Sequence, residues 1–208
     1  MIRAIVLAAG ASSRMGSAKA ALLLGPTGET LAARVVRTLL EGGVPDVTVV
    51  AGAHIDAVRR AMPRHERRAR VIEHPGWQDG QLSSLLAGLA AIDDALLEAA
   101  LVTLVDMPLV RPETVAAVIT AWRRTQAPIV RPAQDDRHGH PVIFDRAVFA
   151  DLRAADPREG AKAIFARYRD HILNVGVDDE GAFTDIDTPG DYQRIVSRWT
   201  ESPGHGSA

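Results

Sequence analysis

Short apolar runs alternate with amphipathic segments along nearly the whole sequence. This alternation is typical of an α/β fold, in which helices cover both faces of a largely parallel sheet. The apolar runs predict strands at residues 4–7, 47–50, 71–72, 101–105, 129–130, 142–144 and 172–175. The amphipathic segments predict helices at residues 31–40, 55–62, 83–91, 112–124, 147–154 and 160–167, and a last helix after Thr188. We therefore expect a three-layer α/β/α architecture.

Residues that favour helix ends support several of these predictions. Thr30 is placed to cap the helix at 31–40, and Gly42 is placed to end it. Pro112 suits the first turn of the helix at 112–124. Before the last helix, Thr188 gives an N-cap, and a proline and then an acid follow at the first and third helical positions.

Length and composition limit the kinds of protein to which this chain can belong. The 208 residues predict one domain, at residues 1–200, with a flexible tail at 201–208. Hydrophobic residues make up 47% and charged residues 24%, which excludes disorder across the whole chain. The absence of cysteine excludes disulfides, thiolate zinc sites, iron–sulfur clusters and cysteine catalysis. A net charge of −2 argues against a non-specific nucleic-acid partner.

No apolar run approaches the ~20 residues that a bilayer-spanning helix needs, so no membrane partner is expected. Residues 1–10 are apolar, but the run is short and no extended basic region precedes it. We interpret it as a buried first strand rather than a signal peptide, which predicts a cytoplasmic protein.

A glycine-bearing loop at residues 10–19 follows the first predicted strand. Loops of this kind bind phosphates through backbone N–H groups. Serine at position 12 breaks the dinucleotide fingerprint, and the glycine spacing breaks the P-loop pattern. Arg14 and Lys19 could together grip a triphosphate, although a surface turn with two solvated cations fits the same residues. Lys19 and Lys162 are the only lysines in an arginine-rich sequence, which favours a specific use for Lys19.

Acidic residues stand at two positions where a ligand-binding edge is expected. Asp106 follows the predicted central strand at 101–105, where its carboxylate could bind Mg²⁺ or form a turn before Pro108. Asp185 and Asp187 precede the last helix, where acids also stabilise a helix N-terminus. Because Thr188 supplies the cap, Asp187 is left free for another role.

Several other residues could have either a structural or a functional role. Ser83 and Ser84 lie near a predicted helix start after Gly80, where an ordinary N-cap would also place them. His138 and His140 lack a third ligand at a spacing that suits zinc. Trp77 could stack on a flat ring or pack in the core.

The segment at residues 7–19, LAAGASSRMGSAK, resembles the signature L-A-A-G-x-S-x-R-M-G-x-x-K. That signature marks the MobA/MocA-like nucleotidyltransferases, which activate the molybdenum cofactor. Four further blocks resemble the family in the same order, at residues 80–85, 105–108, 137–142 and 185–191. Val105 replaces a usual glycine, His138 is inserted, and Gly190 replaces a glutamate. The resemblance extends from residue 2 to about residue 195 and is closest to the cytidylyltransferase branch.

The resemblance implies a Rossmann-like nucleotidyltransferase fold with a mostly parallel mixed sheet, and it implies a role for each block. Its nucleotide-binding residues would be Leu7, Ala8, Ala9, Gly10, Ser12, Arg14, Gly16, Lys19, Gly80, Ser83 and Ser84. Its catalytic residues would be Arg14, Lys19 and Asp106. Mg²⁺ would be bound by Asp106 and Asp187, with Asp185 in support. The acceptor substrate would be bound by Arg137, Gly139, His140 and Pro141.

The expected reaction is transfer of CMP from CTP to the phosphate of molybdopterin, with release of pyrophosphate. The acceptor phosphate is already an anion, so no general base or covalent nucleophile is needed. Ala9 stands where guanylyl-transferring members carry glycine, which favours cytosine. Molybdenum hydroxylase apoenzymes would receive the product. The alternatives are another nucleotide or phosphorylated acceptor, a non-catalytic cofactor-delivery protein, and a dehydrogenase.

Overall fold

The computed structural model describes residues 1–12, 15–25, 28–63, 66–156 and 160–201, with side chains described as far as residue 197. Within these ranges the chain forms an eight-stranded sheet and a separate two-stranded one. The large sheet has the spatial order β10 (Ile172–Gly176), β7 (Ile129–Gln134), β9 (Val142–Asp145), β6 (Ala99–Leu104), β1 (Ile2–Ala8), β4 (Val47–Ala51) and β5 (Ala69–Glu73), with β8 (Arg137–His138) paired to β7. The small sheet joins β2 (Leu23–Leu24) to β3 (Glu29–Thr30).

Strand direction confirms the predicted mixed, mostly parallel sheet. Neighbouring strands from β6 through β1 and β4 to β5 run parallel, as do β7 and β10. Only β8 and β9, among the described strands of this sheet, run antiparallel to their neighbours. Parallel pairs place their carboxyl ends at one edge, and in α/β sheets this is the edge where ligands bind.

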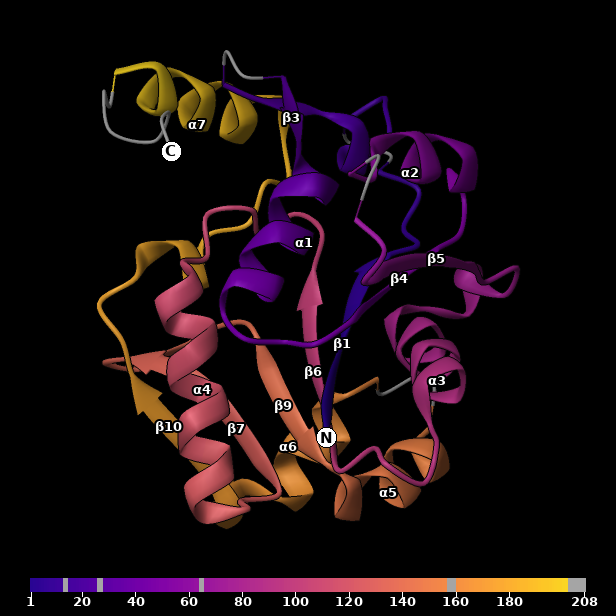
Figure 1. Cartoon of the computed structure of the whole chain (residues 1–208), viewed down its shortest axis with the longest axis vertical. Helices are drawn as coiled ribbons and strands as arrows, with labels where there is room; N and C mark the ends of the chain where they lie inside the picture. Colours follow the sequence, from indigo (N-terminus) through magenta and orange to yellow (C-terminus); the bar gives the residue numbers. More distant parts are fainter. Residues whose placement is uncertain (13–14, 26–27, 64–65, 157–159, 202–208) are drawn as a thin grey trace.

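Helices cover both faces of the sheet, which completes the predicted three layers (Figure 1). One hydrophobic cluster joins the sheet to α1 (Leu31–Glu41), α2 (Ile55–Ala61) and α4 (Pro112–Thr125). The other joins it to α3 (Gln81–Ile92), α5 (Phe149–Ala154) and α6 (Lys162–Arg167). The last helix, α7 (Pro189–Glu201), contributes Ile195 to a third cluster with Leu24, Leu31 and Ile186. No helix among the described residues has the length and apolar character needed to cross a bilayer.

The position of β1 within the sheet explains why residues 4–8 are apolar without interruption. Ala4 and Val6 pack into the cluster on the α1 side, and Ile5 and Leu7 pack into the cluster on the α3 side. A strand covered on both faces has no solvent-exposed positions at which polar residues would alternate. This confirms the interpretation of residues 4–7 as a buried strand.

Several predicted helix ends are also confirmed. The Thr30 side chain accepts a 3.1 Å hydrogen bond from the Ala33 N–H at the start of α1, and Gly42 is its C-cap. At α7, the Asp191 carboxylate accepts from the Thr188 N–H at 2.7 Å, and the Asp191 N–H donates back to Thr188 Oγ1 at 3.2 Å. This reciprocal pair is the capping box that the sequence predicts.

Local structure differs from the prediction at several points. Helix α3 begins at Gln81 rather than residue 83, because Gly80 adopts a φ of 99° and forms the N-cap. The predicted helices at 147 and 160 begin at Phe149 and Lys162. The two-residue strands β2, β3 and β8 are too short to leave a periodic signal. Five 3₁₀ turns were not predicted, namely η1 (Lys19–Ala21), η2 (Trp77–Asp79), η3 (Arg146–Val148), η4 (Arg169–His171) and η5 (Glu180–Phe183).

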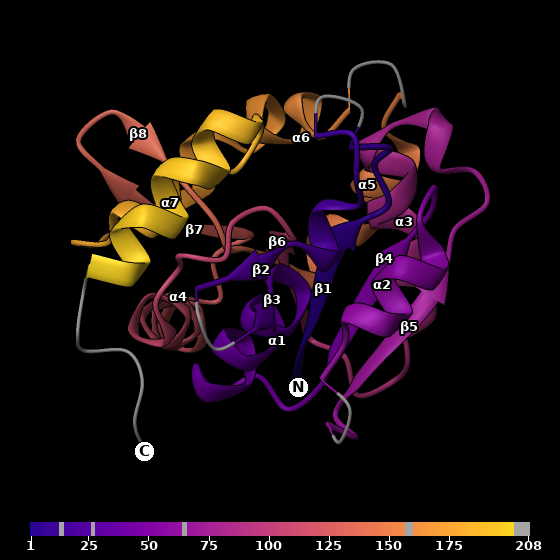
Figure 2. The same cartoon turned by 90° about the horizontal axis from the view of Figure 1, so that it is seen from above.

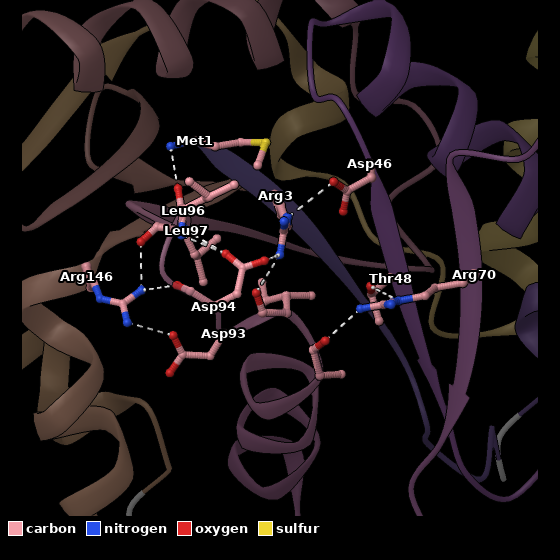
Figure 3. Close-up of polar contacts among 12 residues, drawn as sticks. Met1, Arg3, Asp46, Thr48, Arg70, Asp93, Asp94, Leu96, Leu97 and Arg146 are labelled. Carbon is pink, nitrogen blue, oxygen red and sulfur yellow. Dashed lines mark hydrogen bonds and ion pairs between the residues drawn. The ribbon is translucent and has the colours of Figure 1, made fainter.

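Arginines tie together the amino-terminal edge of the sheet (Figure 3). Arg3 on β1 donates to the Ile92 carbonyl at 2.8 Å and pairs with Asp94 at 2.6 Å and Asp46 at 3.3 Å. Arg146 donates to the carbonyls of Asp94 and Leu97 at 2.9 and 2.7 Å. These contacts join the ends of β1, α3 and β9, so this edge is structural.

Candidate active site

A cavity of about 400 Å³ lies at the carboxyl ends of β1 and β6, on the opposite edge of the sheet. Figure 2, seen from above, looks onto this edge, and α7 lies at the same end of the molecule. The predicted nucleotide-binding residues that line the cavity are Leu7, Ala8, Ala9, Gly10, Ser12, Lys19, Gly80 and Ser84. Asp106 and Asp187 line it as well. Two other predicted nucleotide-binding residues, Gly16 and Ser83, do not line the cavity. A third, Arg14, lies outside the part of the chain that the structure describes.

The centre of the site is an ion-pair cluster of Lys19, Asp106 and Asp187. Lys19 Nζ lies 2.8 Å from Asp106 Oδ2 and 2.7 Å from Asp187 Oδ1. The Lys19 and Asp106 side chains are 13% and 18% exposed, and Asp187 is 36% exposed. Three segments far apart in the sequence therefore meet at one charged point within the cavity.

Backbone contacts hold the two acidic residues together. The Val105 N–H donates to the Leu7 carbonyl at 3.1 Å, which fixes the chain just beyond β6 against β1. The Ile186 N–H donates to the Asp106 carbonyl at 2.9 Å, which places Asp187 beside Asp106. The Asp191 carboxylate, rather than that of Asp187, accepts from the N–H of Thr188. The Asp187 carboxylate is thereby left to face Lys19.

Asp106 lies in a turn closed by a 3.3 Å hydrogen bond from the Met107 N–H to the Leu104 carbonyl, but among the described residues its carboxylate makes no backbone hydrogen bond of the Asx-turn type. Its Oδ2 accepts from Lys19 Nζ, and its Oδ1 is buried without a hydrogen-bond partner among the described residues. A buried carboxylate oxygen with no partner is costly and calls for a further ligand. Asp185 is exposed and does not line the cavity.

The charge of Lys19 is well stabilised. Burial lowers the pKa of Lys19, but hydrogen bonds to Asp106 and Asp187 outweigh it and raise the pKa above its ordinary value. A lysine ammonium thus lies between two carboxylates, where a divalent cation could also bind. Mg²⁺ favours one or two carboxylates completed by phosphate oxygens and water. The unpartnered Oδ1 of Asp106 and the adjacent Asp187 fit that donor set, and no cluster of three candidate ligands occurs within the described ranges.

The glycine-bearing loop is anchored at both of its described ends. Ser12, with a φ of 49°, accepts a 3.3 Å hydrogen bond from the Lys19 N–H on its Oγ. His54 Nε2 lies 2.9 Å from the Ala11 carbonyl oxygen, and His54 lines the cavity. The sequence analysis assigned no functional role to His54. Its position directly after β4 at the ligand-binding edge was the available signal.

Residues 77–84 form the opposite wall. Ser84 is buried and lines the cavity. The less buried Trp77 and Gln81 line it as well. Ser83 Oγ donates to the Gly80 carbonyl at 2.8 Å, so Ser83 fixes the turn before α3 instead of capping the helix. Trp77 packs closely on Gly52, where an added Cβ would lie 2.5 Å from the tryptophan Cβ. Trp77 is half-buried, so it is not a core residue, and its stacking on a flat ring stays a prediction.

The predicted acceptor residues lie apart from this cavity. Arg137 is paired with Glu180 at 2.6 Å and covers the Phe183 ring at 4.9 Å. Gly139 is pressed against the Ala182 carbonyl, which an added Cβ would approach to 2.1 Å. Of these four residues, His140 lines a second cavity, of about 750 Å³. Burial lowers the pKa of His140, and the carboxylates of Asp106 and Asp185 oppose that shift.

Asp179 is a positioning residue that the sequence interpretation missed. Its buried carboxylate accepts from Thr114 Oγ1 at 2.6 Å, the Arg111 N–H at 2.9 Å and the Gly181 N–H at 3.1 Å. These bonds fasten η5 to the start of α4, and η5 leads directly to Asp187. A single aspartate in a loop gave no sequence signal of this role.

Known proteins resemble this chain in sequence and structure. The family described as "MobA-like NTP transferase domain" matches residues 4–172. A relative from Paenarthrobacter nicotinovorans named nicotine blue oxidoreductase is 28% identical over 202 residues, covering 94% of this chain and 96% of the relative. A probable molybdenum cofactor guanylyltransferase from Mycolicibacterium paratuberculosis is 35% identical over 135 residues, covering 64% of each chain.

The described fold also matches solved structures. Rv0371c from Mycobacterium tuberculosis H37Rv superimposes with a TM-score of 0.78 at 26% identity, covering 94% of this chain and 97% of that one. A complex of Rv0371c with manganese superimposes with a TM-score of 0.72.

Proposed function

This chain belongs to the MobA-like NTP transferase family, and on that premise we propose that it transfers CMP from CTP to the phosphate of the molybdenum cofactor. The observation that carries the proposal is the cluster of Lys19, Asp106 and Asp187 at the cavity. Two carboxylates and an ammonium at the carboxyl edge of a parallel sheet suit a nucleoside triphosphate and its metal ion. A relative named as a molybdenum cofactor guanylyltransferase supports this acceptor.

The proposed chemistry is a direct displacement at phosphorus. An oxygen of the acceptor phosphate forms a bond to the α-phosphorus of CTP, and the bond between the α-phosphorus and the α–β bridging oxygen breaks. Pyrophosphate leaves with the electron pair. A phosphate monoester has a second pKa of about 6, so near pH 7 it needs no general base. The task of the protein is to position the reactants and balance their charge.

Named residues account for that task. Lys19 exchanges its carboxylate partners for phosphate oxygens of the nucleotide and holds their negative charge. Asp106 and Asp187 would then hold Mg²⁺, which neutralises the triphosphate and orients it. The loop anchored by Ser12 and His54 presents backbone groups to the nucleotide. Arg14 is proposed as the second phosphate-binding cation.

Cytosine is the proposed base because Ala9 lines the cavity. Ala9 is buried, and its carbonyl accepts from the Ala53 N–H at 3.2 Å, which fixes its position. Its methyl group reduces the room for a purine. The proposed setting is the cytoplasm, where an apo molybdenum hydroxylase would receive the product.

The direct test measures pyrophosphate release with each of the four nucleoside triphosphates, with and without molybdenum cofactor. We expect release with CTP only when the cofactor is present, together with a product whose mass equals cofactor plus CMP. A kcat/KM for GTP equal to or above that for CTP would overturn the choice of base. Absence of release with every nucleotide would overturn the transfer reaction.

An oxidoreductase is the second candidate, because the relative that aligns over 94% of this chain is named as one. The loop at residues 10–19 lacks the glycine spacing of a dinucleotide-binding turn, which weighs against it. Oxidation of a reduced nicotinamide cofactor, measured with a dye acceptor, separates the two candidates. Cofactor oxidation without pyrophosphate release would favour the oxidoreductase.

A further inference from the structure

A second cavity, of about 750 Å³, adjoins the nucleotide cavity. The two cavities share Leu7, Gln81 and Leu104 in their linings. The second one lies on the sheet face formed by β1, β6 and β9, between α3 and α6. Its size falls within the ~300–1,000 Å³ of ordinary small-molecule sites. A molecule bound there would therefore lie directly beside the nucleotide.

The walls of this cavity suit a flat apolar ring. Val102, Val142 and Phe144 are buried lining residues on the sheet side. Phe165 of α6 lies across from them, with its ring centroid 5.9 Å from that of Phe144 and the planes tilted by 57°. The two rings therefore pack against each other, and the apolar lining around them is of the kind that contacts flat heterocycles.

Three polar side chains, Gln81, His140 and Lys162, interrupt the apolar lining. His140 Nδ1 lies 3.4 Å from the Val102 carbonyl oxygen, so the ring is oriented within the wall. Lys162 is exposed and forms no ion pair within the described ranges. The chain has only two lysines. Lys19 lines the nucleotide cavity, and Lys162 lines the adjoining one.

We propose that the second cavity binds the acceptor, a fused-ring heterocycle that carries a phosphate monoester, and that Lys162 attracts its negative charge. This inference rests on the proposed function and adds the place and the chemistry of acceptor binding. The ring lies between α3 and α6 against Val102 and Val142, beside the packed rings of Phe144 and Phe165. Leu7, Gln81 and Leu104 line both cavities, so the phosphate at that end of the ring lies next to the nucleotide. Lys162 is a specificity-determining residue that selects an anionic acceptor over a neutral one.

The experiment measures binding separately from turnover. The full-length protein is titrated with 6-hydroxymethylpterin monophosphate and with the same pterin lacking phosphate, and binding is followed by pterin fluorescence. Lys162→Ala removes the charge, and Ala163→Phe fills the cavity from the same helix. Arg167→Ala is the matched control, because Arg167 lies on α6 and pairs with Asp151 at 2.9 Å outside the cavity lining. CTP binding is measured for each protein by calorimetry.

We expect Lys162→Ala to weaken the phosphorylated pterin at least fivefold and the neutral pterin less than twofold. Ala163→Phe should weaken both pterins at least tenfold. CTP affinity should change less than twofold in all variants, and Arg167→Ala should match the wild type. Lys162→Ala alters only an exposed side chain, so it should fold. The comparison of the two pterins in this variant therefore tests the proposal even if Ala163→Phe does not fold.

Two results would overturn the inference. One is failure of the wild type to bind the phosphorylated pterin while it binds CTP. The other is unchanged pterin affinity in Lys162→Ala. If the variants lose the pterin as expected but the wild type never releases pyrophosphate, the proposed reaction fails and the assignment of the cavity stands.

Discussion

At the level of single residues, Lys19 explains the most about this site. Its ammonium lies within hydrogen-bond distance of both Asp106 and Asp187. The sequence predicted that Lys19 binds phosphate and that the two acids act together. It could not predict that Lys19 contacts both acids, since that contact depends on the meeting of segments separated by 87 and 168 residues.

Replacing Lys19 with methionine should therefore affect activity far more than folding. Loss of one preorganised charge in an active site lowers kcat by roughly 100- to 1,000-fold. The free energy of unfolding should fall by only about 1–2 kcal/mol, because the lost ion pairs are partly exposed to solvent. Steady-state turnover and urea denaturation measure the two effects. Turnover within threefold of the wild type would remove Lys19 from the mechanism.

His140 should give the stability of the protein a distinct pH dependence. Burial lowers the pKa of His140 in the folded protein below the ordinary 6.5. The unfolded chain therefore takes up a proton first as pH falls, so the stability present above pH 6.5 is lost below it. We expect Tm to fall less between pH 7.5 and about 5.5 in His140→Gln than in the wild type or in exposed-site control His171→Gln. Parallel Tm curves for all three would contradict this.

At the level of elements, the segment from Asp179 to Asp187 links the fold to the site. Asp179 fastens η5 to the start of α4, and Ile186 bonds to the carbonyl of Asp106. Helix and strand positions could be predicted because apolar periodicity and capping residues reflect local physics. This irregular segment could not, because its conformation is set by contacts with β6 and α4 rather than by its own sequence.

Gly181→Ala should displace this segment. An added Cβ would lie 2.0 Å from the Leu109 carbonyl oxygen, which cannot yield without moving backbone. We expect a loss of about 1–3 kcal/mol in unfolding free energy and a lower kcat, since Asp187 would move away from Lys19. Gly176→Ala is the control, because no atom lies within 4 Å of its added Cβ. Equal stability and turnover in the two variants would show that η5 does not position the site.

At the level of the whole molecule, the two edges of the sheet have separate tasks. The amino-terminal edge is bound together by Arg3, Arg146 and their partners (Figure 3). The nucleotide cavity lies at the carboxyl edge, which Figure 2 faces, and the second cavity adjoins it on the sheet face between α3 and α6. The architecture could be predicted from the alternating sequence pattern alone. The second cavity could not, since it arises from the spacing between α3 and α6, which no local pattern encodes.

Arg3→Met should test this division. The Arg3 side chain is 17% exposed, and its loss removes a hydrogen bond to Ile92 and ion pairs to Asp46 and Asp94. We expect the unfolding free energy to fall by about 1–3 kcal/mol. The kcat and both KM values should stay within twofold at a temperature where the variant is fully folded. A selective fall in kcat would mean that the two edges are coupled.

The Mg²⁺ dependence of turnover in three aspartate-to-asparagine variants tests the role of the ion-pair cluster most directly. Asp106→Asn keeps the shape of the side chain and removes the charge, so turnover should fall at least 100-fold and require more Mg²⁺, with little change in Tm. Asp187→Asn should be milder, because Asp187 is 36% exposed against 18% for Asp106 and water screens its charge more strongly. Asp185→Asn should be milder again, because Asp185 is exposed and does not line the cavity. Wild-type turnover and Mg²⁺ response in Asp106→Asn would contradict the account, because the metal and triphosphate would then bind elsewhere.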